Sequence, residues 1–294
     1  MERTSHDVLT PEGRRLAVEV AGPPDGEVVI FHTGTPGAPR LFMPLIEAGA
    51  ERGLRHVSYS RPGYDDSDRL PGRTIADCAR DVAAIADALE VERFYTTGQS
   101  GGGPHSLACA ALLPDRVHSA ATTAGVAPFD AEGLDWLAGM GQENLDEFAA
   151  QAAGDDQLQV YIEEYAVRLR SLTGEQVLAA LGDLISDADA AVLTDAYAEH
   201  VAASLQEALR TGIWGWFDDD KASVADWGFD LAKIDVPVTI WQGDEDRMVP
   251  FAHGQWLAEH VSGAKGRLLP GEGHLSLALA TYGEILDALV AARA

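Results

Sequence analysis

Short apolar runs alternate with amphipathic stretches along the first 128 residues of the chain. The apolar or alternating runs predict β-strands at 14–21, 27–31, 54–60, 94–97 and 117–123. The stretches between them have helical spacing and predict helices at 42–52, 74–89 and 106–113. Strands that alternate with helices in this way indicate an α/β fold, in which a mostly parallel sheet is covered by helices on both faces.

This alternation stops near Phe129, and only helical periodicity continues from there to Trp227. The α/β pattern then resumes, with strands expected at 236–241 and 266–269 and helices at 251–261 and 275–292. The pattern therefore predicts a core formed by residues 1–128 and 228–294, with a helical segment, 129–227, inserted into it. We expect this segment to be a lid over the C-terminal edge of the sheet.

The composition is that of a protein that stays in solution. The chain has 294 residues, of which 46% are hydrophobic, and contains no run of 18 apolar residues that would predict a membrane span. The first seven residues are polar and lack the apolar core of a signal peptide, so we expect a cytoplasmic protein. Cys78 and Cys109 lie in separate Ala-rich helical stretches, which predicts buried structural thiols in a reducing compartment.

Acidic residues dominate the charge. The chain has 47 Asp and Glu against 21 Lys and Arg, a net charge of −26. The helical segment 129–227 alone has 21 acidic and four basic residues, a net charge of −17. Such a surface disfavours nucleic acid and anionic membranes as partners. Solubility or adaptation to salt explains the charge more simply than substrate steering. We expect a small-molecule substrate, and a protein that is a monomer or a homodimer.

A Gly-x-Ser-x-Gly motif stands where a predicted strand meets a predicted helix. Gly98, Ser100 and Gly102 follow the strand at 94–97, and the helix begins a few residues later. In this context the serine hydroxyl lies at the apex of a tight turn at the C-terminal edge of the sheet. Glycine on either side permits close backbone approach, and the Gly101 N–H lies at a helix N-terminus. Ser100 is therefore the candidate nucleophile.

A serine nucleophile needs a general base, and the base needs an acid to orient it. Among nine histidines, His274 lies in a glycine-rich loop between the last predicted strand and helix, whereas we expect His105 to point away from the nucleophile and His253 to lie on the surface. The loop after the strand at 236–241 offers three carboxylates, Asp244, Glu245 and Asp246. Charge alone does not choose among them, and the loop could also be a solvated turn or a cation site.

These motifs together resemble those of α/β-hydrolase-fold serine hydrolases over essentially the whole chain. The order serine, acid, histidine is the order in that family. The family's acid stands in Gly-x-x-Asp-x-x-x-Pro, which Gly243, Asp246 and Pro250 match, so the resemblance implies the triad Ser100, Asp246 and His274. It also implies an α/β-hydrolase fold with a mostly parallel eight-stranded sheet, helices on both faces and an inserted helical lid.

Two further loops carry the resemblance. Residues 32–37 read His-Thr-Gly-Thr-Pro-Gly, similar to the family's oxyanion loop, which implies that the Thr35 and Gly101 N–H groups form the oxyanion hole, with Gly34 as the alternative to Thr35. Residues 60–67 correspond to a family loop that reads Asp-x-Pro-Gly-x-Gly-x-Ser. Here Ser60 replaces the aspartate and Asp65 replaces a glycine, changes that bear on the loop and not on the triad.

The resemblance implies acyl-enzyme hydrolysis of a carboxylic ester or lactone of a neutral, largely apolar small molecule, without a metal or cofactor. An aromatic cluster either packs the lid or lines its pocket, and supplies the candidate substrate-binding residues Trp214, Trp216, Phe217 and Trp227. Three alternatives remain: a prolyl-aminopeptidase-type peptidase that binds an amino group through carboxylates such as Glu163 and Glu164, an acyltransferase or perhydrolase, and a non-catalytic receptor on the same fold.

Overall fold

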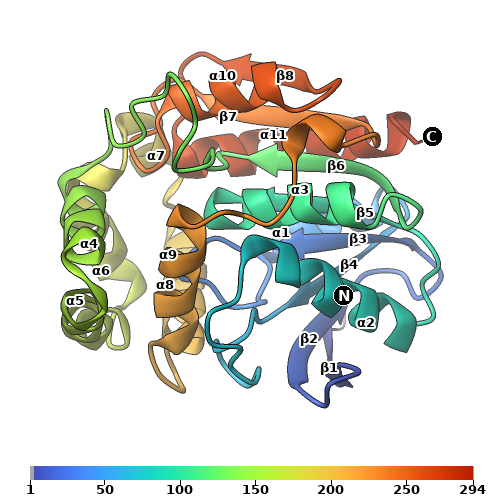
Figure 1. The fold of residues 1–294 in the computed structure, drawn as a ribbon, viewed down its shortest axis with the longest axis horizontal. Helices are drawn as coiled ribbons and strands as arrows, with labels where there is room; N and C mark the ends of the chain where they lie inside the picture. Colours follow the sequence, from blue (N-terminus) through green and yellow to red (C-terminus); the bar gives the residue numbers. More distant parts are fainter. Residues whose placement is uncertain (1–2, 294) are drawn as a thin grey trace.

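A single twisted sheet of eight strands organises the computed structural model, which describes residues 3–293 (Figure 1). The strand order is β1-β2-β4-β3-β5-β6-β7-β8; the β1–β2 and β2–β4 pairs are antiparallel and all later pairs are parallel. The strands are β1 Arg3–Leu9, β2 Arg15–Ala21, β3 Glu27–His32, β4 Leu54–Tyr59, β5 Phe94–Gln99, β6 Val117–Thr123, β7 Val238–Gly243 and β8 Lys265–Leu269. The predicted α/β fold and its mostly parallel sheet are confirmed.

The first strand, β1, is absent from the strands that the sequence predicts. It pairs with β2 from Arg3↔Ala21 to Leu9↔Arg15 at the edge of the sheet. Val8 is its only buried residue, so its sequence shows no apolar alternation. Polar residues are common on edge strands, where they oppose pairing with another molecule.

Helices cover both faces of the sheet, as the apolar strand runs require. One face packs on α1 (Met43–Ala50) and α11 (His274–Ala291), and the other on α2 (Cys78–Ala88), α3 (Gly103–Leu112) and α10 (Phe251–His260). Along β3, Val29 and Phe31 belong to the first core, and Val28 and Ile30 to the second. Because both faces of β3 are buried, its sequence contains a continuous run of apolar residues.

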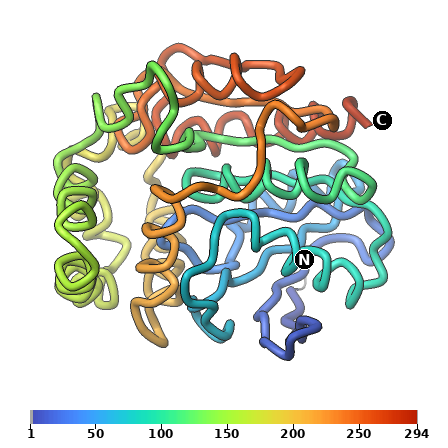
Figure 2. Tube along the Cα trace, viewed as in Figure 1, coloured from blue at the N-terminus to red at the C-terminus, as the bar shows by residue number. Residues whose placement is uncertain are grey.

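The helical segment is inserted between β6 and β7, which are neighbours in the sheet despite being far apart in the chain (Figure 2). It contains α4 (Gln142–Ala153), α5 (Asp155–Leu169), α6 (Gly174–Leu181), α7 (Asp187–Val192), α8 (Asp195–Ala208) and α9 (Trp214–Val224). Four short 3₁₀ turns complete the structure, at Ile75–Asp77, Ser100–Gly102, Gly182–Leu184 and Leu231–Lys233.

The helical segment lies beside the edge of the sheet to which the arrowheads of β3 and β6 point (Figure 1). It has an apolar core of its own, which includes Leu158 and Ile162 of α5, Ala202 of α8 and Trp216 of α9. The helical periodicity predicted for 129–227 is therefore present. The division at residues 128 and 228, and the role of this segment as a lid, stay predictions.

A buried carboxylate fastens α9 to the loops that follow β3 and β4. Asp219 of α9 accepts hydrogen bonds from Arg61 Nε (3.1 Å), Arg73 Nη2 (2.6 Å), Tyr64 Oη (2.8 Å) and Thr35 Oγ1 (2.8 Å). Burial alone would raise the pKa of Asp219, but the two guanidinium groups hold it well below its usual range. Asp219 therefore remains charged inside the protein, between two buried cations.

Arg61 extends this network to the backbone of the loop after β3. Its side chain is 2% exposed, and its Nη1 and Nη2 groups donate to the carbonyls of Thr33 (2.5 Å) and Gly34 (2.8 Å). Burial opposes the charge of the Arg61 guanidinium, but Asp219 raises its pKa above the usual value. Because one side chain binds both this loop and α9, the position of the loop depends on the helical segment.

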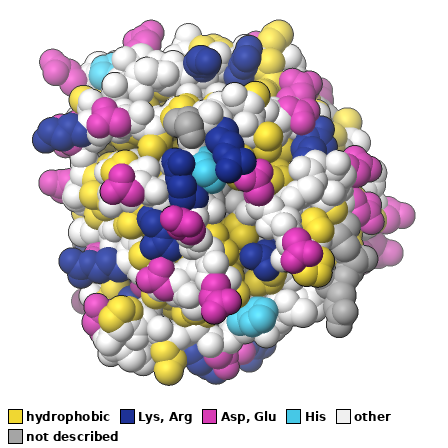
Figure 3. Space-filling view, turned by 90° about the vertical axis from the view of Figure 1, so that its right-hand side faces the viewer, with side chains coloured by type: hydrophobic (Ala, Val, Ile, Leu, Met, Phe, Trp, Pro, Cys, Tyr) yellow, Lys and Arg dark blue, Asp and Glu magenta, His cyan; other side chains and the backbone are white. Residues whose placement is uncertain are grey.

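Away from the helical segment, basic and acidic side chains are interspersed on the face that Figure 3 shows. By sequence, most of the acidic excess belongs to residues 129–227, which have a net charge of −17. Both cysteines are buried and free, as predicted. Within residues 3–293, no helix has the length and apolar character needed to cross a membrane.

The Asp219 network predicts a large difference in stability between two adjacent substitutions on α9. Asp219→Asn should lower the free energy of unfolding by about 3–5 kcal/mol, because it leaves the buried Arg61 and Arg73 without a counter-charge. Asp218→Asn should cost less, about 1–2 kcal/mol, because its partner Arg69 is 31% exposed and can be hydrated without it, although Asp218 itself is buried. Urea unfolding followed by circular dichroism at neutral pH measures both values. Equal losses would show that the two buried arginines do not require Asp219.

Candidate active site

The backbone is so close-packed at the Ser100 turn that only glycine fits at positions 98 and 102. Ser100 lies between β5 and α3 and has φ +54°, in the left-handed region that residues other than glycine rarely occupy. A Cβ on Gly98 would lie 2.1 Å from the Gly102 carbonyl oxygen, and one on Gly102 would lie 2.2 Å from the His32 carbonyl oxygen. The turn is therefore compact, with the serine at its apex.

His274 and Asp246 form a hydrogen-bonded pair. His274 Nδ1 lies 2.9 Å from Asp246 Oδ2 and 3.1 Å from Oδ1. The carboxylate is buried and also accepts from the Met248 N–H (2.9 Å), the Val249 N–H (2.8 Å) and Gln242 Nε2 (3.0 Å). Burial disfavours a charge on the imidazole, but the adjacent Asp246 outweighs it and raises the pKa of His274 above its usual value.

The other carboxylates of the loop after β7 do not contact this histidine. Asp244 Oδ1 accepts a hydrogen bond from the Gly271 N–H at 2.7 Å, and the side chain is exposed. Glu245 is exposed too. Of the three carboxylates that charge alone did not distinguish, Asp246 is the one that contacts His274.

A carboxylate of the helical segment holds the backbone at His274, a contact that no sequence pattern predicted. Asp189 on α7 accepts hydrogen bonds from the backbone N–H groups of His274 (3.1 Å), Leu275 (2.7 Å) and Ser276 (2.9 Å). These are donors of the first turn of α11, which have no partner within the helix. Asp189 therefore caps α11 and fixes the residue that carries the imidazole. Its local signal, Ser186-x-x-Asp189, marks the start of α7 but not this partner.

The loop after β3 lies against the Ser100 turn. A Cβ on Gly34 would lie 3.3 Å from Ser100 Cβ, and one on Gly101 would lie 2.5 Å from Thr35 Oγ1 and 3.5 Å from Thr35 N. The three predicted oxyanion-hole residues, Thr35, Gly101 and Gly34, are thus next to one another. Which N–H groups would bind an oxyanion stays a prediction.

A cavity of about 250 Å³ opens beside the Ser100 turn, between the sheet and the helical segment. Ser100, His274, Thr35 and Gly34 line it, and most of its other walls are apolar side chains, among them Leu45, Leu169, Leu172, Leu181, Val201, Leu205 and Met248. Of the four predicted substrate-binding aromatics, Trp216 lines this cavity.

The other three predicted aromatics do not line the cavity and have structural contacts instead. Trp214 is 36% exposed and lies under the Arg69 guanidinium, 3.9 Å from it. Phe217 is buried in the core of the helical segment, and Trp227 is buried in the core beneath α2 and α3. Packing accounts for these three side chains, and their substrate-binding role stays a prediction that the cavity lining does not support.

A second, smaller cavity of about 110 Å³ meets the first at the nucleophile. Ser100, Thr35, Asn144, Glu147 and Met248 line both cavities. The smaller one adds Asp220 and His105, so His105 is nearer to the nucleophile than the sequence suggested. Glu163 and Glu164, proposed from the sequence as amino-binding groups, are exposed on α5 and line neither cavity.

His253 is fully buried, which corrects its predicted surface position. Its Nε2 lies 2.8 Å from the Trp136 carbonyl oxygen, and its Nδ1 accepts from the Ala127 N–H at 3.1 Å. Burial lowers the pKa of this ring. The start of α10 faces the loop after β6, so a position that looks peripheral in the sequence lies inside the fold.

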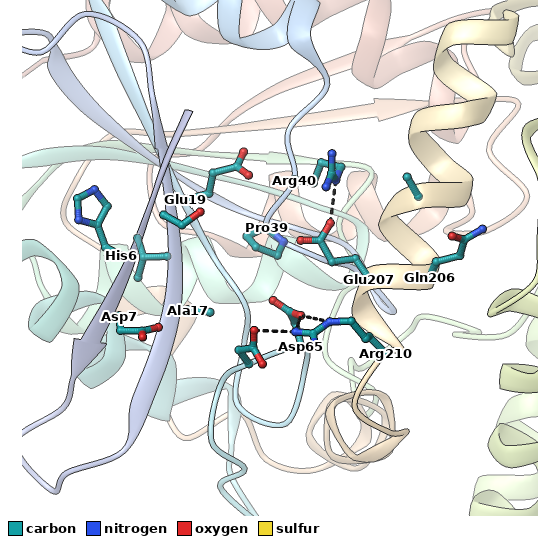
Figure 4. Close-up of a pocket in the computed structure, with 14 residues that line it drawn as sticks. His6, Asp7, Ala17, Glu19, Pro39, Arg40, Asp65, Gln206, Glu207 and Arg210 are labelled. Carbon is teal, nitrogen blue, oxygen red and sulfur yellow. Dashed lines mark hydrogen bonds and ion pairs between the residues drawn. The ribbon is translucent and has the colours of Figure 1, made fainter. Parts of the chain in front are cut away.

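A larger cavity, of about 730 Å³, lies elsewhere, between β1, β2 and α8 (Figure 4). Its charged groups largely neutralise one another: Arg40 Nε lies 2.7 Å from Glu207, and Arg210 lies 2.5 Å from Asp65. None of the predicted catalytic residues lines it. The predicted catalytic residues Ser100 and His274 therefore line the 250 Å³ cavity and not this larger one. In the part of the chain that the structure describes, no three His, Cys, Asp or Glu side chains come together as a metal site.

Known proteins resemble this chain over nearly its full length. Residues 27–281 match the family model described as alpha/beta hydrolase fold. A non-heme chloroperoxidase from Streptomyces lividans is 28% identical over 95% of this chain and 96% of the relative. A bromoperoxidase from Bacillus anthracis has a TM-score of 0.68 at 22% identity and covers 98% of this chain and 99% of its own. An enol-lactonase from Burkholderia xenovorans has a TM-score of 0.68 at 18% identity, over 97% and 98%.

The family match covers most of the chain, and it agrees with the sheet order, the Ser100 turn and the Asp246–His274 pair described above. The chain therefore belongs to the α/β-hydrolase-fold family and is an α/β-hydrolase enzyme.

Proposed function

We propose that this enzyme is a serine hydrolase that cleaves a carboxylic ester or lactone of a largely apolar small molecule through an acyl-enzyme. The observation that carries this proposal is that Ser100 and His274 line one cavity, with the buried Asp246 hydrogen-bonded to His274. A serine at a sharp turn, a histidine on the same cavity and a buried carboxylate bound to that histidine are the parts of a nucleophilic triad.

In the proposed first step, Ser100 Oγ attacks the substrate carbonyl carbon while His274 Nε2 takes the hydroxyl proton. Asp246, bound to Nδ1, holds the imidazole in the required tautomer and stabilises the imidazolium that forms. The tetrahedral intermediate collapses, His274 gives the proton to the leaving alkoxide, and the acyl group stays on Ser100. Water then attacks the acyl-enzyme with His274 as base, which releases the acid and restores Ser100.

The Thr35 and Gly101 N–H groups are proposed to stabilise the oxyanion in both steps. Support comes from the position of Thr35, which the Asp219 network holds against the Ser100 turn through its Oγ1. Donors that are fixed before the reaction stabilise developing charge without reorganisation, and losing one costs about 100- to 1,000-fold in rate. The hydrogen bonds of Asp219 to Thr35 and the two arginines therefore support the proposal that the Thr35 N–H belongs to the oxyanion hole.

The cavity walls and one relative favour an ester or lactone with apolar bulk. The main cavity has predominantly apolar lining side chains, which suits an apolar acyl or alkyl group. The enol-lactonase whose fold this chain shares is named for lactone cleavage. A second candidate is perhydrolysis, in which hydrogen peroxide replaces water as the acyl acceptor. The relatives named chloroperoxidase and bromoperoxidase favour it.

The Ser100 assignment predicts loss of turnover without loss of fold. Ser100→Ala should abolish hydrolysis of p-nitrophenyl acetate and butyrate and labelling by a fluorophosphonate, because both need the same Oγ nucleophile. The melting temperature should not fall, since alanine is no larger than serine at this half-buried position. Measured turnover close to wild type would refute the nucleophile assignment. Peracid formation with added hydrogen peroxide would identify the second candidate.

The acid assignment predicts unequal effects of two substitutions in one loop. Asp246→Asn should lower kcat by about 1,000- to 10,000-fold, whereas Asp244→Asn, which affects only a turn, should leave it close to wild type. Catalysis needs neutral His274, so the rate falls as pH drops through the pKa of His274, which Asp246 raises. The acid limb of the kcat/KM profile should therefore move to lower pH in Asp246→Asn only. A severe loss in Asp244→Asn instead would move the acid to residue 244.

A further inference from the structure

A buried and a half-buried carboxyl group line the smaller cavity beside Ser100. They are Asp220 of α9, which is 5% exposed, and Glu147 of α4. The two carboxyl groups hydrogen-bond each other, but Asp220 Oδ2 has no donor among the described residues. Glu147 accepts a hydrogen bond from Trp216 Nε1 at 2.5 Å. A buried carboxylate oxygen without a donor is rare in native structures and calls for a partner.

No cation of the described residues supplies that partner. Arg73 opposes the rise in the pKa of Asp220, but its Nη2 donates to Asp219 (2.6 Å) and to the Gly215 carbonyl (3.1 Å), not to Asp220. Burial, the charge of Glu147 and the hydrogen bond to Glu147 raise the pKa of Asp220, and burial raises that of Glu147 although its hydrogen bonds with Asp220 and Trp216 oppose this. The pair therefore shares a proton, and an entering cation would take the place of that proton.

Glu143, one turn before Glu147 on α4, lines the adjoining main cavity and is a third carboxyl group near Ser100 with no arginine of the described residues bound to it. Burial and the neighbouring Glu147 raise its pKa to about 7. Arg168 opposes this effect but does not remove it. The carboxyl groups near Ser100 thus outnumber the cations available to them, in contrast to Asp219, which two arginines neutralise.

Aromatic and thioether groups form part of the other walls of the smaller cavity, together with aliphatic side chains. Trp136 and Phe148 pack edge to face with ring centroids 4.6 Å apart, and Met140 and Met248 line the same cavity. Aromatic faces attract alkylated ammonium groups, and the methionines suit their methyl groups. Asp219 lines the cavity too but is bound by two arginines, so a bare metal ion would find, among the described residues, only two carboxyl groups without a cationic partner, whereas an alkylammonium would find both charge and apolar walls.

We propose that the smaller cavity is a subsite for a protonated alkylamine, so that the substrate is an ester with an amino group on one side of the scissile bond and apolar bulk on the other. This inference rests on the proposed hydrolase function for the placement of the scissile bond, and it replaces the neutral substrate expected from the sequence. The amine would occupy the 110 Å³ cavity and the apolar group the 250 Å³ cavity, with the carbonyl at Ser100 between them.

Two pairs of isosteric esters test the subsite from either side of the bond. The first pair is 2-(dimethylamino)ethyl acetate and 3-methylbutyl acetate, and the second is the p-nitrophenyl esters of 4-(dimethylamino)butanoic acid and 5-methylhexanoic acid. The members of each pair differ only in charge. In at least one pair, kcat/KM of the wild-type enzyme should favour the cationic member by about tenfold or more.

Substitutions of the two carboxyls should remove this preference. Asp220→Asn and Glu147→Gln keep the shape of the side chains, and each should bring the cationic-to-neutral ratio of kcat/KM close to one. Glu163→Gln, an exposed position on α5, is the matched control and should keep the wild-type ratio. The ratio is measured within each variant, so a general loss of activity or stability does not imitate the result. A wild-type preference for the neutral members, or a ratio that survives both substitutions, would overturn the proposal.

Binding to the Ser100→Ala variant separates the subsite from the catalytic proposal. Its tryptophan fluorescence should change on titration with 2-(dimethylamino)ethyl acetate at lower concentration than with 3-methylbutyl acetate, because Trp136 and Trp216 line the site. Selective binding without any wild-type turnover would refute the hydrolase and retain the amine subsite. Turnover of the neutral esters without selective binding would do the reverse.

Discussion

The placement of the active site depends on one buried carboxylate, Asp219. Its bonds to Arg61, Arg73 and Thr35 join α9 of the helical segment to the loops after β3 and β4. An uncompensated charge inside a protein costs several kcal/mol, so neither the carboxylate nor the arginines can be moved independently. The loop that lies against Ser100 is therefore positioned by the helical segment as well as by the sheet.

This dependence explains why the helical segment cannot be regarded as a passive cover. Asp219 holds the Thr35 side chain beside Gly101, and Asp189 of the same segment binds the backbone N–H of His274. Two of its acidic residues thus fix two different sides of the site. A rearrangement that opened the cavity by moving this segment as a whole would have to break both sets of bonds. Smaller movements of α4 to α6, which lie outside these contacts, would cost less.

Sequence reasoning succeeded where a local pattern has one physical solution. The Ser100 turn needs glycine at 98 and 102, and a strand before it and a helix after it leave little freedom for the serine. The same holds for the alternation of strands and helices, which indicated the fold class, and for the spacing from Gly243 to Asp246, which selected the carboxylate that His274 contacts.

The sequence did not reveal β1, because an edge strand needs no apolar face. Nor did the sequence say which of the four aromatics meets the cavity, because helical periodicity does not identify that face; of the four, Trp216 lines it.

The contacts that no local pattern could reveal are those between acidic residues and distant partners. Asp218, Asp219 and Asp220 are consecutive and look alike in the sequence, yet the fold gives them three different environments. The first pairs with a partly exposed arginine, the second lies between two buried arginines, and the third faces a cavity without a cation. Each step along α9 turns the side chain by about 100°, so neighbours meet different elements. The net charge of −26 therefore contains both Asp219, the carboxylate that joins the helical segment to the site, and Asp220, a carboxyl group of the proposed amine subsite.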